Sequence, residues 1–90
     1  MNLLDFEAAL AALTDEERHR FLDEGTGGPA ICERLLVVLA RRVGADDVEC
    51  WQRGFIGWCV KWREPIGWTR YHTDPSRIRA VTAALEATKP

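Results

Sequence analysis

The sequence predicts an α+β domain in which three N-terminal helices and one C-terminal helix pack on one face of a small antiparallel sheet. Two patterns lead to this prediction. Apolar residues recur at spacings of three and four up to about residue 43 and again after residue 75, as in amphipathic helices, whereas they alternate with polar residues in between, as in strands. With 90 residues, of which 47% are hydrophobic, residues 1–90 are expected to fill one core and form a single domain.

The first predicted helix covers residues 2–13, because four apolar residues share one of its faces: Leu3, Phe6, Leu10 and Leu13. The second covers residues 15–24 and begins at a capping box. In that motif the Thr14 hydroxyl accepts a hydrogen bond from the Glu17 amide, and the Glu17 carboxylate accepts one from the Thr14 amide. Few apolar residues follow, so we expect the second helix to lie on the surface.

The third predicted helix covers residues 29–43 and should be central to the fold. Pro29 suits its first turn, because the missing amide proton is not needed there, and Gly44 ends it. Apolar residues surround most of its circumference, which is typical of a helix packed on several sides. A last helix is predicted over residues 75–87, with Asp74 as N-cap and Pro75 at the first helical position.

Two strands are predicted over residues 55–63 and 67–73, joined by a type I turn that ends in a bulge at Gly67. This turn places Lys61 opposite Tyr71. Period-two alternation assigns four residues of the first strand to the inner, helix-covered face: Ile56, Trp58, Val60 and Trp62.

A third strand over residues 48–52 is a weaker prediction, so the sheet is expected to be a two- or three-stranded meander. A tight turn at Arg53 and Gly54 would join this strand to the next and would bring Trp51 to the inner face.

Composition excludes several classes of function. Three cysteines at irregular spacing imply neither a disulfide framework nor a metal site, so no metal and no cofactor are expected. No apolar run is long enough for a membrane span and the first residues do not resemble a secretory signal, so we expect a cytoplasmic protein with no membrane partner. His72, with Tyr71 and Asp74 beside it, is the nearest approach to an acid–base set, and no nucleophile has a marked base, so no enzymatic activity is expected.

Charge divides the chain into two unlike halves. The net charge is −2, but residues 1–49 carry −6 and residues 50–90 carry +4. The basic half also holds most of the aromatic residues, and its outward-facing members form the candidate binding site: Arg53, Phe55, Lys61, Arg63 and Tyr71. A secondary acidic surface is predicted on the second helix: Asp15, Glu16, Glu17, Asp23 and Glu24.

Two functions fit these residues. The preferred interpretation is a non-enzymatic protein–protein interaction module, an adaptor or an inhibitor, because exposed aromatic residues are typical anchors of protein interfaces. In size and composition alone the chain is similar to small adaptors and to phage-encoded inhibitors of bacterial defence, such as anti-CRISPR proteins. The alternative is a nucleic-acid-binding protein in which rings stack on bases and cations hold phosphates. An unpaired edge strand leaves both a monomer and a homodimer open.

Overall fold

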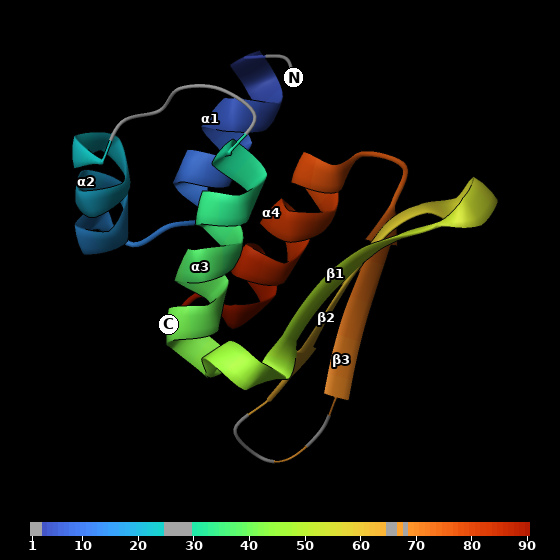
Figure 1. Ribbon diagram of the computed structural model, residues 1–90. Coiled ribbons are helices and arrows are strands. Elements are labelled where there is room, and N and C mark those ends of the chain that lie inside the picture. The colour runs from blue at the N-terminus through green and yellow to red at the C-terminus, as the bar shows by residue number, and fades with distance from the viewer. Residues whose placement is uncertain (1–2, 25–29, 65–66, 68) are drawn as a thin grey trace.

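The computed structural model describes residues 3–24, 30–64, 67 and 69–90, and it has the predicted α+β architecture (Figure 1). Four helices and three strands follow one another in the order α1 (Leu3–Ala11), α2 (Asp15–Asp23), α3 (Ile31–Val43), β1 (Val48–Arg53), β2 (Gly57–Arg63), β3 (Thr69–Asp74) and α4 (Arg77–Thr88). Two short 3-10 helices flank β1: η1 (Ala45–Asp47) and η2 (Gly54–Ile56). None of the described helices combines the length and the apolar character needed to cross a bilayer.

The helices form one layer and the sheet the other. The central helix α4 contacts β2, β3, α3 and α1, while α2 lies at the far side of the helical layer (Figure 1). The largest fully buried side chains come from both layers: Leu13, Leu35, Leu39, Cys59, Val60, Val81 and Leu85. Trp62 is only 2% exposed, as the alternation pattern predicted for the inner face of the sheet. Burying such side chains contributes about 1.5–3 kcal/mol each, so the core shared by the helices and the inner face of the sheet is a main source of stability.

The sheet is an antiparallel meander in the order β1-β2-β3, which confirms the third strand. Lys61 lies opposite Tyr71, as predicted. The Gly67 amide donates to the Glu64 carbonyl at 2.9 Å, and Gly67 has a φ of 93°, both features of the expected turn with a glycine bulge. The residues between them, 65 and 66, lie outside the described part of the chain, as does Trp68.

The connection between β1 and β2 differs from the prediction, and so does the face on which Trp51 lies. Residues 54–56 form η2 instead of a tight turn and the start of a strand, so Ile56 is exposed rather than buried. A two-residue turn at Arg53 and Gly54 would have paired Trp51 with Ile56, but Trp51 pairs with Cys59. The register of β1 against β2 is therefore shifted by three residues, an odd number. Because successive side chains of a strand point to opposite faces, that shift moves Trp51 from the inner face to the outer one.

The ends of the helices are mostly as expected. The capping box at Thr14 is complete, with both reciprocal hydrogen bonds to Glu17 present, and Gly44 ends α3 with a φ of 110°. The predicted start of the last helix is wrong. Asp74 is the last residue of β3 and its carboxylate accepts a hydrogen bond from the Ser76 amide at 2.9 Å, so α4 begins only at Arg77. The Asp74 side chain thereby stabilises a turn before the helix instead of capping the helix itself, because a short carboxylate can accept hydrogen bonds from backbone amides in either arrangement. The proposed role of Pro29 in α3 lies outside the described residues.

Candidate interaction surface

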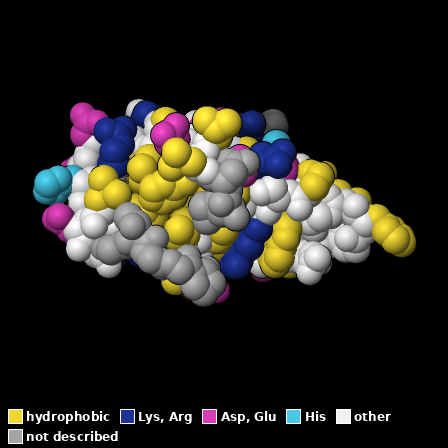
Figure 2. Space-filling view, turned by 90° about the horizontal axis from the view of Figure 1, so that it is seen from above, with side chains coloured by type: hydrophobic (Ala, Val, Ile, Leu, Met, Phe, Trp, Pro, Cys, Tyr) yellow, Lys and Arg dark blue, Asp and Glu magenta, His cyan; other side chains and the backbone are white. Residues whose placement is uncertain are grey.

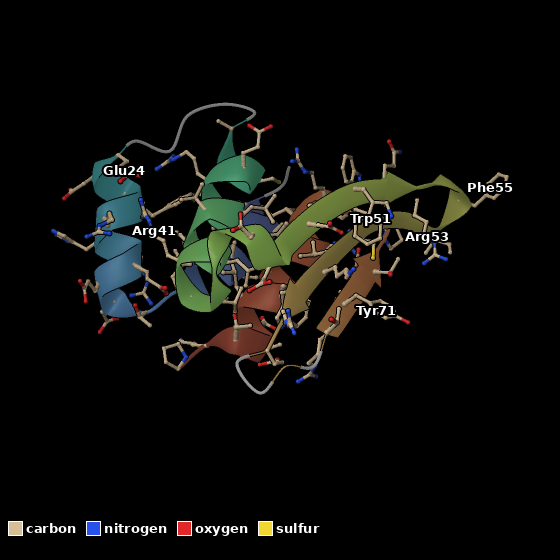
Figure 3. The ribbon with its side chains drawn as sticks, turned by 60° about the horizontal axis from the view of Figure 1, so that its bottom comes forward. Glu24, Arg41, Trp51, Arg53, Phe55 and Tyr71 are labelled. Carbon is tan, nitrogen blue, oxygen red and sulfur yellow. The ribbon has the colours of Figure 1, made fainter. Side chains whose placement is uncertain are left out.

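The strongest candidate site is the face of the sheet that the helices leave uncovered, which we call the outer sheet face. The strand register assigns to it the odd-numbered residues of the three strands: Glu49, Trp51, Arg53, Cys59, Lys61, Arg63, Thr69, Tyr71 and Thr73. Figure 3 shows Trp51, Arg53 and Tyr71 on this side of the molecule, away from the helical layer. Four of the five predicted binding residues lie on this face. Lys61, Arg63 and Tyr71 do so because the alternation of β2 and β3 was predicted correctly, whereas Arg53 lies at the end of β1 instead of in the predicted tight turn.

Two aromatic residues dominate this face. Tyr71 is 67% exposed on β3, and Trp51 is 36% exposed on β1. Cys59 lies beside Trp51 in the same cross-strand row and is only 1% exposed, so its thiol does not contribute to the surface. Sequence reasoning missed Trp51 because the length of the β1–β2 connection could not be read from the residues. The only signal was the pair of glycines at positions 54 and 57, which permits a longer turn.

The charged residues of the outer sheet face are mainly cations. Arg53 and Arg63 are exposed, and Lys61 lies opposite Glu49 with 3.9 Å between the Lys61 ammonium and the Glu49 carboxylate. Both members of that pair are largely exposed, so their attraction is weak and either one can interact with another molecule. The three strands thus place three cations and one anion on this face in a chain that is negative overall, with Asp46 and Asp47 of η1 next to Lys61 and Arg63 at one end.

Phe55 does not join this cluster. It is fully exposed in η2 at the tip of the β1–β2 hairpin, next to Ile56 with 52% exposure. Figure 2 shows hydrophobic side-chain atoms at this extreme end of the molecule, where the hairpin projects beyond the helices. The base of the tip contacts the body of the protein, because the Gly57 backbone closely approaches the backbone of Asp74 and Pro75. The tip is thus an apolar projection, anchored at its base, at one end of the outer sheet face.

The predicted acidic surface of α2 contains exposed carboxylates that form local ion pairs, and Asp15 is 98% exposed. Asp15 forms an ion pair with Arg18 at 3.1 Å, and the Asp23 carboxylate lies 3.6 Å from His19. Glu17 is the least accessible of the acidic residues that form ion pairs here, because it binds the buried side chain of Arg42 and its own side chain is 22% exposed. This residue therefore has a structural role in addition to any contribution to the acidic surface.

Arg42 is the centre of a hydrogen-bond network that ties three helices and the end of α1 together. Its Nε donates to the Glu17 carboxylate at 2.9 Å, and its Nη2 donates to the other Glu17 oxygen. The remaining donors reach three further oxygens: the Ala12 carbonyl at 3.0 Å, the Leu85 carbonyl at 2.7 Å and the Thr88 hydroxyl at 3.1 Å. The five N–H donors of the guanidinium are matched by five oxygen contacts, which compensates for burial of its charge.

This network predicts a loss of stability in acid. The hydrogen bond to Arg42 lowers the pKa of Glu17 from 4.5 to about 2, against the opposing effect of burial. A carboxylate with a lowered folded-state pKa stabilises the protein fully above its unfolded pKa, and this contribution declines as the pH falls from 4.5 towards 2. We expect the wild type to lose about 2 kcal/mol over that interval relative to Glu17→Gln, which keeps the capping geometry but does not titrate. Urea unfolding at a series of pH values measures the difference, and parallel curves for the two proteins would contradict the assignment.

A groove between α2 and α3 is a further candidate site. It has a volume of about 130 Å³ and is lined by the apolar side chains of Phe21, Val37 and Val38 and by charges of both signs. Glu24 and Arg41 stand on its two sides (Figure 3). Arg34 and Phe21, which both line the groove, contact each other: the Arg34 guanidinium donates a hydrogen bond to the Phe21 carbonyl and stacks over the Phe21 ring, 4.2 Å from its centroid. The mixed charge favours no particular ligand, so this groove is a weaker candidate than the outer sheet face.

The described residues contain no group of three or more histidine, cysteine or acidic side chains arranged to hold a metal ion. The three cysteines are unpaired, and burial raises the pKa of the Cys32 thiol. The outer sheet face brings together two aromatic rings and three cations within the described ranges. No protein-family model matches the chain, and neither a curated protein nor a solved structure shows significant similarity to it.

Proposed function

We propose that this protein is a non-enzymatic interaction module that binds an acidic surface of another protein through its outer sheet face. The observation that carries the proposal is that all four helices lie on one side of the sheet, so the other side exposes Trp51 and Tyr71 among cations. Aromatic residues and arginine are the residue types enriched at protein interfaces.

The chemistry of the partner follows from the charges. Arg53, Lys61 and Arg63 give the outer sheet face its positive charge, so it fits a surface rich in carboxylates. The aromatic residues supply the apolar contact that charged groups alone do not. Phe55 at the hairpin tip adds an anchor at the edge of this surface, because an exposed ring on a projection anchored at its base loses little conformational freedom on binding.

Tyr71→Ala is expected to weaken binding of the partner about 30-fold, since a well-buried aromatic anchor contributes about 2 kcal/mol to an interface. Thr69→Ala is the matched control, because Thr69 lies on the same strand and the same face without a ring, and its change should alter affinity less than about three-fold. The partner is identified by affinity capture with the wild type, and each variant is then titrated with that purified partner. Equal affinity of the wild type and Tyr71→Ala would remove the outer sheet face from the proposal.

A nucleic-acid-binding function is the second candidate, and the position of Trp51 favours it. Two exposed rings on an open sheet with three nearby cations form the kind of platform on which single-stranded bases stack. Such binding weakens steeply with salt, because cations displace counterions from phosphates. A titration with single-stranded RNA and DNA separates the candidates. If the wild type binds in a salt-dependent manner and the double variant Lys61→Ala/Arg63→Ala does not bind, the proposed partner would be a nucleic acid instead of a protein.

A further inference from the structure

β1 is an edge strand with one long side free. In the sheet order β1-β2-β3 it pairs only with β2. Glu49, Trp51, Gln52 and Arg53 are all exposed, so the free side is accessible over most of the strand. An accessible edge presents unpaired backbone amides and carbonyls, which can pair with another strand.

The opposite edge of the sheet is protected against such pairing, whereas β1 is not. On β3, Arg70 points to the inner face but lies exposed beside the helical layer. Inward-pointing charged residues are a common means of preventing edge-to-edge association. The inward-facing residues of β1 are Val48, Cys50 and Gln52, and none of them is a lysine, an arginine or an acidic residue. The free side of β1 is therefore the edge that can accept a further strand.

The sequence of β1 is complementary to itself. When two antiparallel strands pair about a two-fold axis perpendicular to the sheet, residues of the same face lie opposite each other. With Trp51 opposite the partner's Trp51, Glu49 lies opposite the partner's Arg53, and symmetry repeats that pair. The result is two cross-strand ion pairs flanking an aromatic pair, all of which are favourable in antiparallel sheets.

The adjacent same-face register lacks this match. Centring the pair on Cys50 places Glu49 opposite the partner's Trp51, so no ion pair forms on the outer face. The contact of Glu49 with Lys61 at 3.9 Å does not prevent the new pair, since the Glu49 side chain is 66% exposed and can reach both cations.

We propose that two copies of this chain pair through β1 as a two-fold homodimer, which joins two three-stranded sheets into one continuous sheet. This inference goes beyond the proposed function and does not depend on it, because purified protein without a partner is sufficient for its test. In the dimer the two outer sheet faces form one continuous surface, with Trp51 and the partner's Trp51 at its centre.

The test is a charge-reversal cycle followed by sedimentation velocity from about 10 μM to about 1 mM, since an interface of one strand pair is small and weak. Glu49→Arg and Arg53→Glu should each raise the dimer dissociation constant about ten-fold or more, because each brings like charges together twice. The double variant Glu49→Arg/Arg53→Glu restores opposite charges and should recover most of the affinity. Arg63→Glu is the matched control, because it reverses a charge on the same face but away from β1 and should leave the constant unchanged.

Cross-linking gives a second measurement, which is independent of affinity. In a Cys50→Ser/Cys59→Ala background, which removes the thiol that lies opposite position 51 in the same chain, Trp51→Cys should form an intermolecular disulfide, because opposed antiparallel residues lie about 4.5–5.5 Å apart between Cα atoms. Glu49→Cys should not, since the two copies of residue 49 are then offset by four residues, or about 13 Å. A chain that is monomeric at every concentration, a dimer unaffected by both single reversals, or a disulfide at position 49 instead of 51 would each overturn the proposal. Circular dichroism of each variant confirms that the fold is retained.

Discussion

Arg42→Ala is expected to destabilise the protein by about 3–5 kcal/mol, which is most of the stability of a domain of this size. The change removes five hydrogen bonds at once. It takes the guanidinium donors away from the Ala12 and Leu85 carbonyls, and it leaves the Glu17 carboxylate with the Thr14 amide but without its cation. An unpaired charge inside a protein costs far more than the intact pair contributes. Urea unfolding followed by tryptophan fluorescence measures the loss, because Trp62 is buried in the native state.

The neighbouring Arg41→Ala is the matched control, since Arg41 is exposed on the same turn of α3, and its effect should stay below about 0.5 kcal/mol. A further variant separates the buried charge from the lost packing. Arg42→Met combined with Glu17→Gln leaves no unpaired charge, so it should be more stable than Arg42→Met alone. If Arg41→Ala and Arg42→Ala were equally stable, the network would not be the link between the helices that its geometry indicates.

This network also shows where sequence reasoning stops. The capping box at Thr14 and Glu17 could be predicted because both partners lie within one turn. The capping pattern is a sufficient reason for a glutamate at position 17, so nothing in the sequence indicates that this glutamate also contacts Arg42, which lies 25 residues away. A local explanation that is correct can therefore hide a long-range one, which here is the contact of the Glu17 carboxylate with Arg42.

The sheet shows the same division between local and long-range information. The turn from Glu64 to Gly67 has strict residue requirements, so the register of β2 and β3 followed from the sequence and placed Lys61 opposite Tyr71. The β1–β2 connection has glycines that fit more than one length. Since a shift of one residue exchanges the two faces of a strand, an uncertain loop was enough to put Trp51 on the wrong side. The residues of the candidate surface on β2 and β3 were thus predicted correctly, whereas the prediction for β1 lacked Trp51.

Gly57→Ala is expected to be the most damaging change in the hairpin, with a loss of about 3 kcal/mol or more. A Cβ at this position would lie 2.5 Å from the Pro75 Cα and 2.6 Å from the Asp74 carbonyl oxygen, and both are backbone atoms that cannot rotate away. The φ of 104° adds strain, because side chains of L-residues rarely adopt it. The junction between β3 and α4 would have to move away from the sheet, and thermal unfolding should show a fall of about 10 °C or more.

Gly54→Ala provides the matched control for this prediction. Gly54 also has a positive φ, 45°, but a Cβ there meets no atom within 4 Å, so only the left-handed backbone is penalised, by about 1–2 kcal/mol. The difference between the two variants therefore measures the close approach of Gly57 to Pro75 together with the difference in backbone strain between a φ of 104° and a φ of 45°. Equal losses would mean that this approach does not hold the hairpin. A larger loss at Gly57 would show that the position of Phe55 is fixed by the junction of β3 with α4, as a rigid anchor requires.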